Sequence, residues 1–233
     1  MLKISLPAFN LHSRVIFLGP PGSGKGTQAP LIRQLFRLAH LSTGDMLRDA
    51  VARDTAHGKK AKALMDEGHL VNDEIVVDIV QDAIRADDCK RGFILDGFPR
   101  TVRQAELLDE MLSHHNHAID CVISLTVDDE LLVQRVTGRL IHPPSGRSYH
   151  PLFNPPKCEG LDDVTNEPLV KRDDDTEEKL RTRLHAFHEK TAPVLQHYKD
   201  KVVQVPADDG VQQIGERVRE ALGRIAQQKM GEY

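Results

Sequence analysis

Residues 15–27 read VIFLGPPGSGKGT, and this stretch decides the fold. Its first four residues are apolar and partly β-branched, which is typical of a buried parallel strand. Glycines follow at once, and then an apolar helical stripe of Ile32, Leu35 and Phe36. Strand, glycine loop and helix together form a phosphate cradle, because glycine lets backbone N–H groups face an anion and the helix N-terminus adds positive potential. The alternative is a plain glycine-rich turn, but the flanking strand and helix favour the cradle.

The loop differs from the general phosphate-binding motif at one position. Lys25, which would bring a mobile ammonium group to the outer phosphates, is followed by Gly26, and the hydroxyl comes one residue later at Thr27. This variant of the motif restricts the set of protein families to which the chain could belong. Pro30 removes a helical N–H, so we expect it to bend the helix.

The composition is that of an ordinary globular protein. The 233 residues are 39% hydrophobic and 28% charged, which allows one good core with small insertions. The net charge of −4 argues against general nucleic-acid binding, and no apolar run approaches membrane-spanning length. We therefore expect neither nucleic acid nor a membrane as a partner.

The cysteines bear on the compartment. Cys89, Cys121 and Cys158 lie far apart with no C-x-x-C pair, which indicates a reducing environment and no disulfide framework. Residues 1–13 form a short N-terminal arm that resembles neither a signal peptide nor an Arg-rich transit peptide. We expect a cytoplasmic protein, with the mitochondrial intermembrane space as the alternative.

The region after the first helix carries several short helix signals and little strand signal. N-cap residue types at 42–45 predict a helix to about residue 53, with Arg48 one turn in. A second helix is expected over residues 58–70, and a capping signature at 72–74 opens a third. We interpret part of this region as an insert over the sheet edge. Taken alone, Arg48 could be an ordinary exposed side chain.

Residues 92–100 read GFILDGFPR and form a second anchor. The apolar run predicts another buried strand, which ends in Asp96. A carboxylate at the end of a strand beside a phosphate loop sits where Mg²⁺ and its waters would lie. A sharp turn then aims Arg100 back over the strand ends, and Gln104 follows one helical turn later. The alternative makes Asp96 a helix cap and Arg100 an exposed side chain.

A third strand is expected at residues 119–127, with a helix behind it at 128–138. Arg135 and Arg139 are four residues apart and share a helical face. Two like charges placed in this way repel each other, and an anion between them would relieve the repulsion. Surface arginines are common, so the pattern alone leaves both interpretations open.

Residues 140–171 are rich in proline and glycine and are too long for a usual loop, which indicates a small β-like insert. His142, Ser145, Asp162 and Thr165 have the paired spacing of a metal knuckle. Because serine and threonine are poor zinc ligands beside cysteine, we favour a hydrogen-bonded polar cluster over a metal site.

The last part of the chain returns to regular elements. Arg172 precedes an acidic helix start, and the long helix that follows carries Arg183. Residues 202–205 form the last strand, and a C-terminal helix is expected over 210–229.

Five segments together resemble the adenylate kinases. They are GPPGSGKGT, LSTGDMLR, LDGFPRTVRQAE, TGRLIHPPSGRSYH and RDDDTEEKLRTRL, and the resemblance covers about residues 14–226. More closely, the chain is similar to the eukaryotic long-lid type usually called isoenzyme two. The resemblance implies an α/β nucleoside monophosphate kinase fold, with a parallel five-stranded sheet flanked by helices. It also implies an AMP-binding insert at about 42–71 and a lid at about 141–170 within a domain of residues 14–233.

The resemblance also implies an ATP side of the site. The loop residues that hold the ATP phosphates are Gly22, Ser23, Gly24, Lys25, Gly26 and Thr27. Arg139 is expected against the adenine and Arg135 near the phosphates. Ser148 and Tyr149 lie in the lid above the adenine, and the backbone near Pro206 borders it.

On the AMP side, the implied residues are Thr43, Gly44, Arg48, Glu67, Leu70, Val71, Gly97, Arg100, Gln104, Arg172 and Arg183. Gly97 and Gln104 read the adenine edge, and Arg172 and Arg183 close on the transferring phosphoryl group. Asp96 orients Mg²⁺ through water, while Asp174 and Asp175 are arginine partners near the lid hinge. The implied catalytic residues are Lys25, Arg100, Arg135, Arg172 and Arg183.

The implied reaction is MgATP + AMP ⇌ 2 ADP, which maintains the balance of adenine nucleotides. Mg²⁺ comes with ATP, and no zinc is expected because the lid lacks the four cysteines of zinc-binding members. We expect a monomer whose partners are ATP, AMP and ADP. The alternatives are a GTP-dependent enzyme of the same fold, a nucleotide-controlled switch and a metal-binding structural protein. Arginines at both phosphate sites argue against the switch, which needs only one nucleotide.

Overall fold

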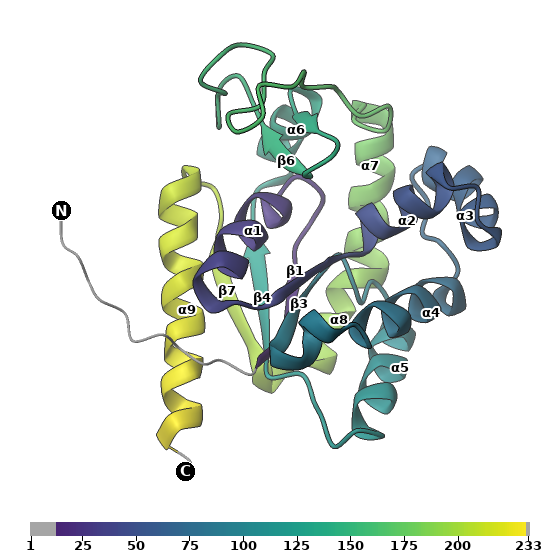
Figure 1. The fold of residues 1–233 in the computed structure, drawn as a ribbon, viewed down its shortest axis with the longest axis vertical. Coiled ribbons are helices and arrows are strands. Elements are labelled where there is room, and N and C mark those ends of the chain that lie inside the picture. The colour runs from purple at the N-terminus through teal and green to yellow at the C-terminus, as the bar shows by residue number, and fades with distance from the viewer. Residues whose placement is uncertain (1–12, 232–233) are drawn as a thin grey trace.

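The computed structural model describes residues 13–231, so residues 1–12 of the expected N-terminal arm lie outside the described residues. Its centre is a parallel sheet with the strand order β2-β3-β1-β4-β7 (Figure 1). The strands are β1 (Ser13–Leu18), β2 (Ala39–Ser42), β3 (Gly92–Asp96), β4 (Cys121–Thr126) and β7 (Val202–Pro206). This confirms the predicted five-stranded parallel sheet. All five strands end at one edge, where their carboxyl ends meet.

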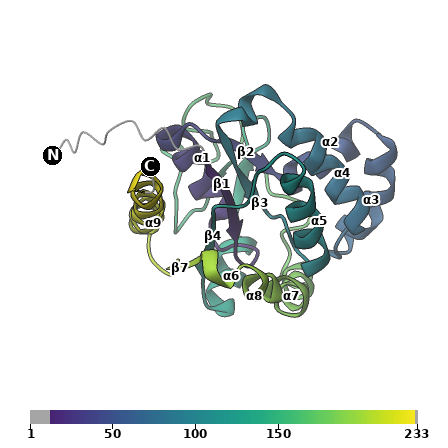
Figure 2. The same ribbon diagram turned by 90° about the horizontal axis from the view of Figure 1, so that it is seen from below.

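Helices cover both faces of the sheet, because successive side chains of a strand point to opposite faces. Val15 and Phe17 of β1 pack in one core cluster with α1 (Lys25–Phe36) and α9 (Val211–Gly231). Ile16 and Leu18 pack in the other cluster, with α4 (Asp73–Ile84), α5 (Val102–Ser113) and α8 (Ala192–His197). In Figure 2, α9 and α5 lie on opposite sides of the sheet.

The predicted capping residues begin helices. The Ser42 hydroxyl accepts a hydrogen bond from the Asp45 N–H at the start of α2 (Thr43–Ala52). Asn72 caps α4 in the same way. Between them lies α3 (Ala56–Asp66), which begins before and ends before the predicted range. Helix α1 runs unbroken through Pro30.

The expected long helix after Arg172 is not continuous, which corrects our prediction. It divides into α7 (Glu177–Ala186), a π turn η2 (Phe187–Thr191) and α8. The Ala192 N–H donates to the Phe187 carbonyl five residues back, and the following Pro193 has no N–H to continue the ladder.

The segment 140–170 leaves the core between α6 (Asp129–Thr137) and α7, and lies above the sheet in Figure 1. It contains an antiparallel hairpin of β5 (Leu140–His142) and β6 (Arg147–Tyr149), and it is closed by a bridge between Ile141 and Val170. Leu132, Val136, Leu180 and Leu184 form a small core beneath it. The β-like insert predicted here is therefore present.

Two short 3-10 turns, η1 (Asp87–Arg91) and η3 (Lys199–Lys201), precede β3 and β7. Over the described residues, no helix combines the length and the hydropathy that crossing a membrane requires.

Candidate active site

A cavity of about 690 Å³ opens at the carboxyl ends of the strands. In a parallel sheet this edge is where ligands bind. The predicted residues that line it are Gly22, Gly24, Lys25, Gly26, Thr27, Thr43, Gly44, Arg48, Leu70, Val71, Asp96, Gly97, Arg100, Gln104, Arg135, Arg139, Ser148, Tyr149, Arg172 and Arg183. Residues from both inserts and from the core therefore share one space.

Three predicted residues are not on the cavity wall. Ser23 is fully buried behind the loop. The exposed Glu67 side chain turns toward His69, 3.7 Å away. Pro206 is exposed, and its carbonyl accepts a hydrogen bond from Arg217. The cavity is bounded instead by their chain neighbours at 68–69 and 208–211.

The glycine loop holds Lys25 at the floor of the cavity. Gly24 has a left-handed φ of 96° and begins α1, a conformation that favours glycine. The Lys25 ammonium donates to the Gly19 carbonyl at 2.7 Å and to the Pro20 carbonyl at 2.9 Å. Burial lowers the pKa of Lys25 to about 8, with further lowering from the positive charges of Arg100 and Arg139. An ammonium held in this way favours an anion as its partner.

Four arginines line the same cavity: Arg48, Arg100, Arg172 and Arg183. Burial and the charges of Arg48 and Arg139 lower the pKa of Arg172 to about 10. Among the described residues, the buried Arg172 Nε has no hydrogen-bond partner. Burial and the charge of Arg183 also lower the pKa of Arg100. A buried donor without a partner among like charges marks a place where a bound anion would be stabilised.

Carboxylates pair with four of the cavity arginines. Asp175 is fully buried and pairs with Arg139 through two hydrogen bonds, and Asp174 pairs with Arg183. These contacts confirm that both aspartates are arginine partners. Asp45 accepts from Arg48 at 2.5 Å and lies 3.6 Å from Arg172.

The turn after β3 arranges polar groups at the other end of the cavity. The Thr43 hydroxyl lies 3.1 Å from the Asp96 carbonyl and 2.9 Å from the Gly97 carbonyl. Arg100 Nε donates to the same Gly97 carbonyl at 2.8 Å. The buried Gln104 amide accepts from the Arg100 backbone N–H at 2.7 Å. This turn therefore fixes both a guanidinium and an amide group.

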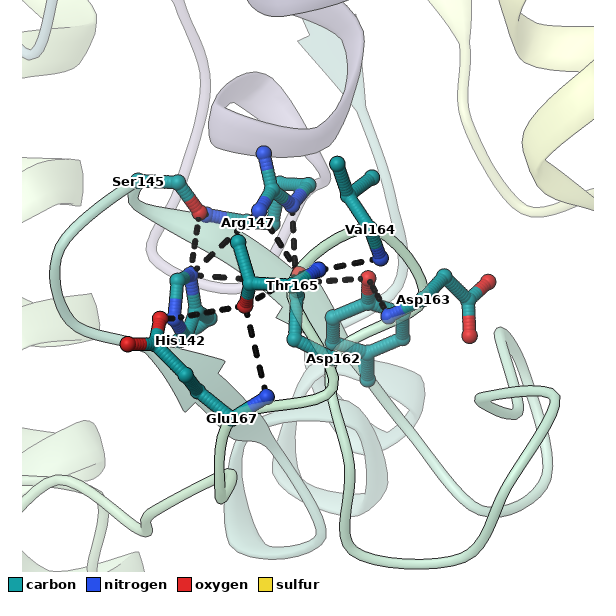
Figure 3. A network of polar contacts seen from close by, with 9 residues as sticks. His142, Ser145, Arg147, Asp162, Asp163, Val164, Thr165 and Glu167 are labelled. Atoms are coloured by element: carbon teal, nitrogen blue, oxygen red, sulfur yellow. Dashed lines mark hydrogen bonds and ion pairs between the residues drawn. The ribbon is translucent and has the colours of Figure 1, made fainter.

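A polar network, rather than a cluster of metal ligands, holds the 140–170 segment together (Figure 3). Asp162 is fully buried and accepts two hydrogen bonds from Arg147 and one from the Tyr149 hydroxyl. His142 lies 2.7 Å from the Ser145 hydroxyl and 2.6 Å from a carboxylate oxygen of Glu167. The predicted hydrogen-bonded cluster is confirmed. Within the described residues, no three His, Cys, Asp or Glu side chains are placed to hold a metal ion.

Comparison with known proteins agrees with this geometry. The sequence model of the family described as adenylate kinase matches residues 17–203. Adenylate kinase 4 of Arabidopsis thaliana is 53% identical over 211 residues, which is 90% of this chain and 86% of the plant protein. Adenylate kinase 3 of Oryza sativa subsp. japonica is 54% identical over 211 residues, 90% of this chain and 88% of its own. An adenylate kinase of Aspergillus niger is 56% identical over 187 residues, 80% of this chain and 72% of the fungal protein.

The chain belongs to the adenylate kinase family. It is therefore a nucleoside monophosphate kinase that transfers a phosphoryl group between ATP and AMP. Adenylate kinases generally use ATP as its Mg²⁺ complex.

The donor set around Asp96 fits a hydrated Mg²⁺ ion. Asp96 is 7% exposed and ends β3 on the cavity wall. One of its carboxylate oxygens lies 3.4 Å from His40 Nε2 and 3.9 Å from the point where a Cβ on Gly26 would stand. Carboxylate oxygens are the ligands that Mg²⁺ prefers, and it keeps several of its waters. In this adenylate kinase the carboxylate therefore lies next to the phosphate loop at Gly26.

Arg135 lies on α6, whereas Arg139 lies between the end of α6 and β5, which corrects the expectation that one helix carries both arginines. Arg139 lines the cavity and pairs with the buried Asp175, and its charge helps to lower the pKa of Lys25 and that of Arg172. Arg135 instead donates to the Ala207 carbonyl at 2.6 Å and lies over the Phe153 ring at 5.5 Å. The expected roles, Arg135 near the phosphates and Arg139 against the adenine, stay predictions, and these contacts favour the exchanged assignment. The four-residue spacing predicted a shared helical face, but α6 ends at Thr137, before Arg139.

Several residues on or next to the cavity were missed from the sequence. His40 pairs with Asp96, Phe153 stacks beneath Arg135, and Thr191 holds the Arg100 carbonyl at 2.9 Å. Asp73 binds the Gln104 amide at 2.7 Å. His40 could have been predicted from the sequence, because it lies just before the predicted helix cap. The other three come from distant segments, and only the folded arrangement brings them together.

Proposed function

We propose that this adenylate kinase binds MgATP and AMP at the two ends of the one cavity and transfers the terminal phosphoryl group between them. The observation that carries the proposal is the number of cationic side chains on one cavity. The cavity is lined by Lys25, Arg48, Arg100, Arg135, Arg139, Arg172 and Arg183. A site for one nucleotide would not need so many cationic side chains.

The donor end is built from the glycine loop and the 140–170 segment. Backbone N–H groups of residues 22–27 and the N-terminus of α1 would hold the ATP phosphates, with Lys25 and Arg139 on the outer ones. Arg135, Phe153 and the backbone at 207–209 would border the base. In this assignment the 140–170 segment acts as a lid over ATP.

The acceptor end is built from the 42–71 insert and the turn after β3. Arg48 and Arg100 would hold the AMP phosphate, while Thr43, Gly97 and Gln104 face the nucleoside. Leu70 and Val71 supply apolar wall. Arg172 and Arg183 enter from the hinge and would meet the phosphoryl group in transfer.

The chemistry requires positioning more than acid–base catalysis. An AMP phosphate oxygen is already an anionic nucleophile, so no side chain has to remove a proton from it. The chain contributes by bringing the two phosphates into line and by surrounding the developing charge with guanidinium groups. Closure of the lid would exclude water, which otherwise competes as acceptor.

Mg²⁺ would supply charge neutralisation on the ATP phosphates. Asp96, through water molecules, is the residue that would hold it. We propose that zinc has no part, because the knuckle positions of the 140–170 segment carry His142, Ser145, Asp162 and Thr165 bonded to one another and to their neighbours.

The first experiment measures ADP formation with ATP or GTP as donor and with AMP, CMP, UMP or GMP as acceptor. We expect ATP with AMP to exceed every other pair. Faster turnover with GTP than with ATP would instead identify the protein as a GTP-dependent enzyme of the same fold. No transfer with any pair, despite tight ATP binding, would leave a nucleotide-binding module and would end the proposal.

Arg100→Ala tests the acceptor end. Loss of a guanidinium that stabilises the transition state costs on the order of 10³–10⁵ in turnover by analogy with arginine fingers. Arg103→Ala on the exposed start of α5 is the matched control and should retain full activity. If Arg100→Ala has near-normal activity with an unchanged fold, Arg100 is not part of the site.

Compartment and oligomeric state belong to the same proposal. Cys89, Cys121 and Cys158 are free thiols, which supports a reducing compartment, with the cytoplasm first and the mitochondrial intermembrane space as the alternative. Subcellular fractionation decides between them. We propose a monomer, and light scattering of the purified protein measures its mass directly against 26.1 kDa.

A further inference from the structure

Both the oxygen and the nitrogen of the Gln104 side-chain amide form hydrogen bonds within the protein. One of the two partners is a donor and the other is an acceptor. The amide oxygen accepts from the Arg100 backbone N–H, and the amide nitrogen donates to Asp73 Oδ1, both at 2.7 Å. A backbone N–H can only donate and a carboxylate can only accept, so each end of the amide has one possible partner. The amide therefore has a defined orientation.

Asp73 is itself held in place. Its second oxygen, Oδ2, accepts from the Thr101 hydroxyl at 3.1 Å. Thr101 also caps α5 by accepting from the Gln104 backbone N–H at 3.1 Å. Asp73 is the first residue of α4, whereas Thr101 and Gln104 belong to the start of α5. One carboxylate thus links two helices and contacts the Gln104 side chain directly.

Gln104 lines the cavity, and Asp73 lies behind it, outside the cavity-lining residues. After its two fixed bonds, the amide has one N–H and one oxygen lone pair left. Adenine offers a donor at N6 beside an acceptor at N1, and guanine offers an acceptor at O6 beside a donor at N1. An amide in one orientation matches one of these patterns, and a rotated amide matches the other.

We propose that Asp73 is a positioning residue that sets the base selectivity of the acceptor site by fixing the orientation of the Gln104 amide. This rests on the proposed function, in which Gln104 faces the base of AMP. Asp73 touches neither substrate nor the reacting atoms and acts only through Gln104. Without Asp73, the Arg100 N–H alone opposes rotation, so selectivity falls rather than vanishes.

The test is Asp73→Ala, assayed with AMP and with GMP as acceptor and MgATP as donor. We expect the ratio of kcat/KM for AMP to that for GMP to fall about tenfold, through a higher KM for AMP, while the KM for ATP stays unchanged. If Asp73 had only a structural role, its removal would lower kcat/KM equally for AMP and for GMP and would leave their ratio unchanged. An unchanged ratio overturns the inference.

Two further variants separate the role of the carboxylate in orienting Gln104 from general effects. Glu74→Ala removes the neighbouring acidic residue from the same first turn of α4. Among the described contacts, the Glu74 side chain makes no hydrogen bond to Gln104. The ratio of kcat/KM for AMP to that for GMP should therefore stay at the wild-type value. Asp73→Asn keeps one oxygen that can accept from Gln104 and should restore the ratio to within about twofold of wild type. Failure of Asn to restore it would also contradict the proposal. If the wild-type protein itself shows no transfer to AMP, the proposed function fails first, and that outcome is seen before any variant is compared.

Discussion

At the scale of single residues, we expect the protonation of Lys25 to depend on whether a nucleotide is bound. Its pKa is lowered to about 8 by burial and by nearby arginines, so near pH 8 about half of the free protein carries a neutral amine. Triphosphate favours the ammonium form and raises the pKa of Lys25. Nucleotide phosphates are already fully ionised at this pH. We therefore expect ATP binding to take up protons above about pH 7.5, and to take up almost none at pH 6.5, where Lys25 is already charged.

Isothermal titration in two buffers of different ionisation enthalpy measures this uptake. Lys25→Arg is the matched control, because a guanidinium stays protonated over the whole range. Equal proton uptake by wild type and Lys25→Arg at pH 8.5 would show that Lys25 is not the titrating group.

Arg135 and Arg139 differ in what surrounds them, and this gives a second prediction. Arg139→Ala should lower kcat by about 10² or more, because its charge acts beside Lys25. Arg135→Ala should chiefly raise the KM for ATP, because it contacts Phe153 and the 207–209 backbone. Steady-state kinetics with varied ATP compare the two variants. The opposite pattern would restore our original assignment.

Removal of Arg139 also leaves the buried Asp175 without its partner, which destabilises the protein by itself. The double variant Arg139→Ala with Asp175→Asn removes that unpaired charge. Its kcat should stay as low as that of Arg139→Ala, whereas its stability should recover. Recovery of kcat as well would mean that stability alone caused the loss.

At the scale of elements, the 140–170 segment depends on polar contacts rather than on an apolar core. Asp162 accepts from Arg147, Tyr149, Val164 and Thr165, and the hydrogen bonds from Arg147 hold its pKa far below the usual range. A carboxyl with a depressed pKa in the folded state contributes stability above its unfolded pKa of about 4 and loses it only as pH falls through the folded value. The segment should therefore stay ordered in mild acid.

Asp162→Ala should open this segment while the sheet stays folded. The buried Tyr149 hydroxyl and the 164–165 N–H groups would lose their acceptor. Limited proteolysis should then cut within residues 140–170 at least tenfold faster. Asp163→Asn is the control, since Asp163 is only half-buried and its carboxylate accepts a single backbone hydrogen bond from Lys157. Equal cleavage rates in the two variants would show that the network does not hold the segment.

Regular elements were predictable where a local pattern decides them. The apolar runs of β1 and β3 and the cap residues of α2 and α4 lie where the sequence indicated. The π turn at Phe187–Thr191 was not predictable, because the apolar spacing continues through it. Its Thr191 hydroxyl meets the Arg100 carbonyl, a contact between segments 91 residues apart that no local pattern encodes.

At the scale of the whole molecule, positive charge is concentrated at one cavity, and the net charge of the chain does not indicate this. The chain carries a net charge of −4, yet Lys25 and six arginines line one cavity. The family resemblance predicted all seven of these residues, because their motifs are continuous in sequence. It could not predict that Glu67 and Pro206 lie off the cavity wall, because the wall depends on tertiary packing. Asp73 was predicted only as part of a helix-capping signature, and its contact with Gln104 emerged from the fold.

A cavity lined by Lys25 and six arginines should be stabilised strongly by phosphate-bearing ligands. A ligand that binds only the folded state at 1,000 times its Kd adds about 4.1 kcal/mol of stability. For a chain of this size, each kcal/mol shifts Tm by about 2–4 °C, so saturating ADP should raise Tm by about 8–16 °C. Differential scanning calorimetry at increasing ADP measures the shift. Adenosine has the same base and ribose but no phosphate, and at equal concentration it should leave Tm within about 1 °C of the free protein, because the site attracts charge rather than the base. An equal shift with adenosine would place the binding energy in the base pockets and would contradict a cavity organised around phosphate.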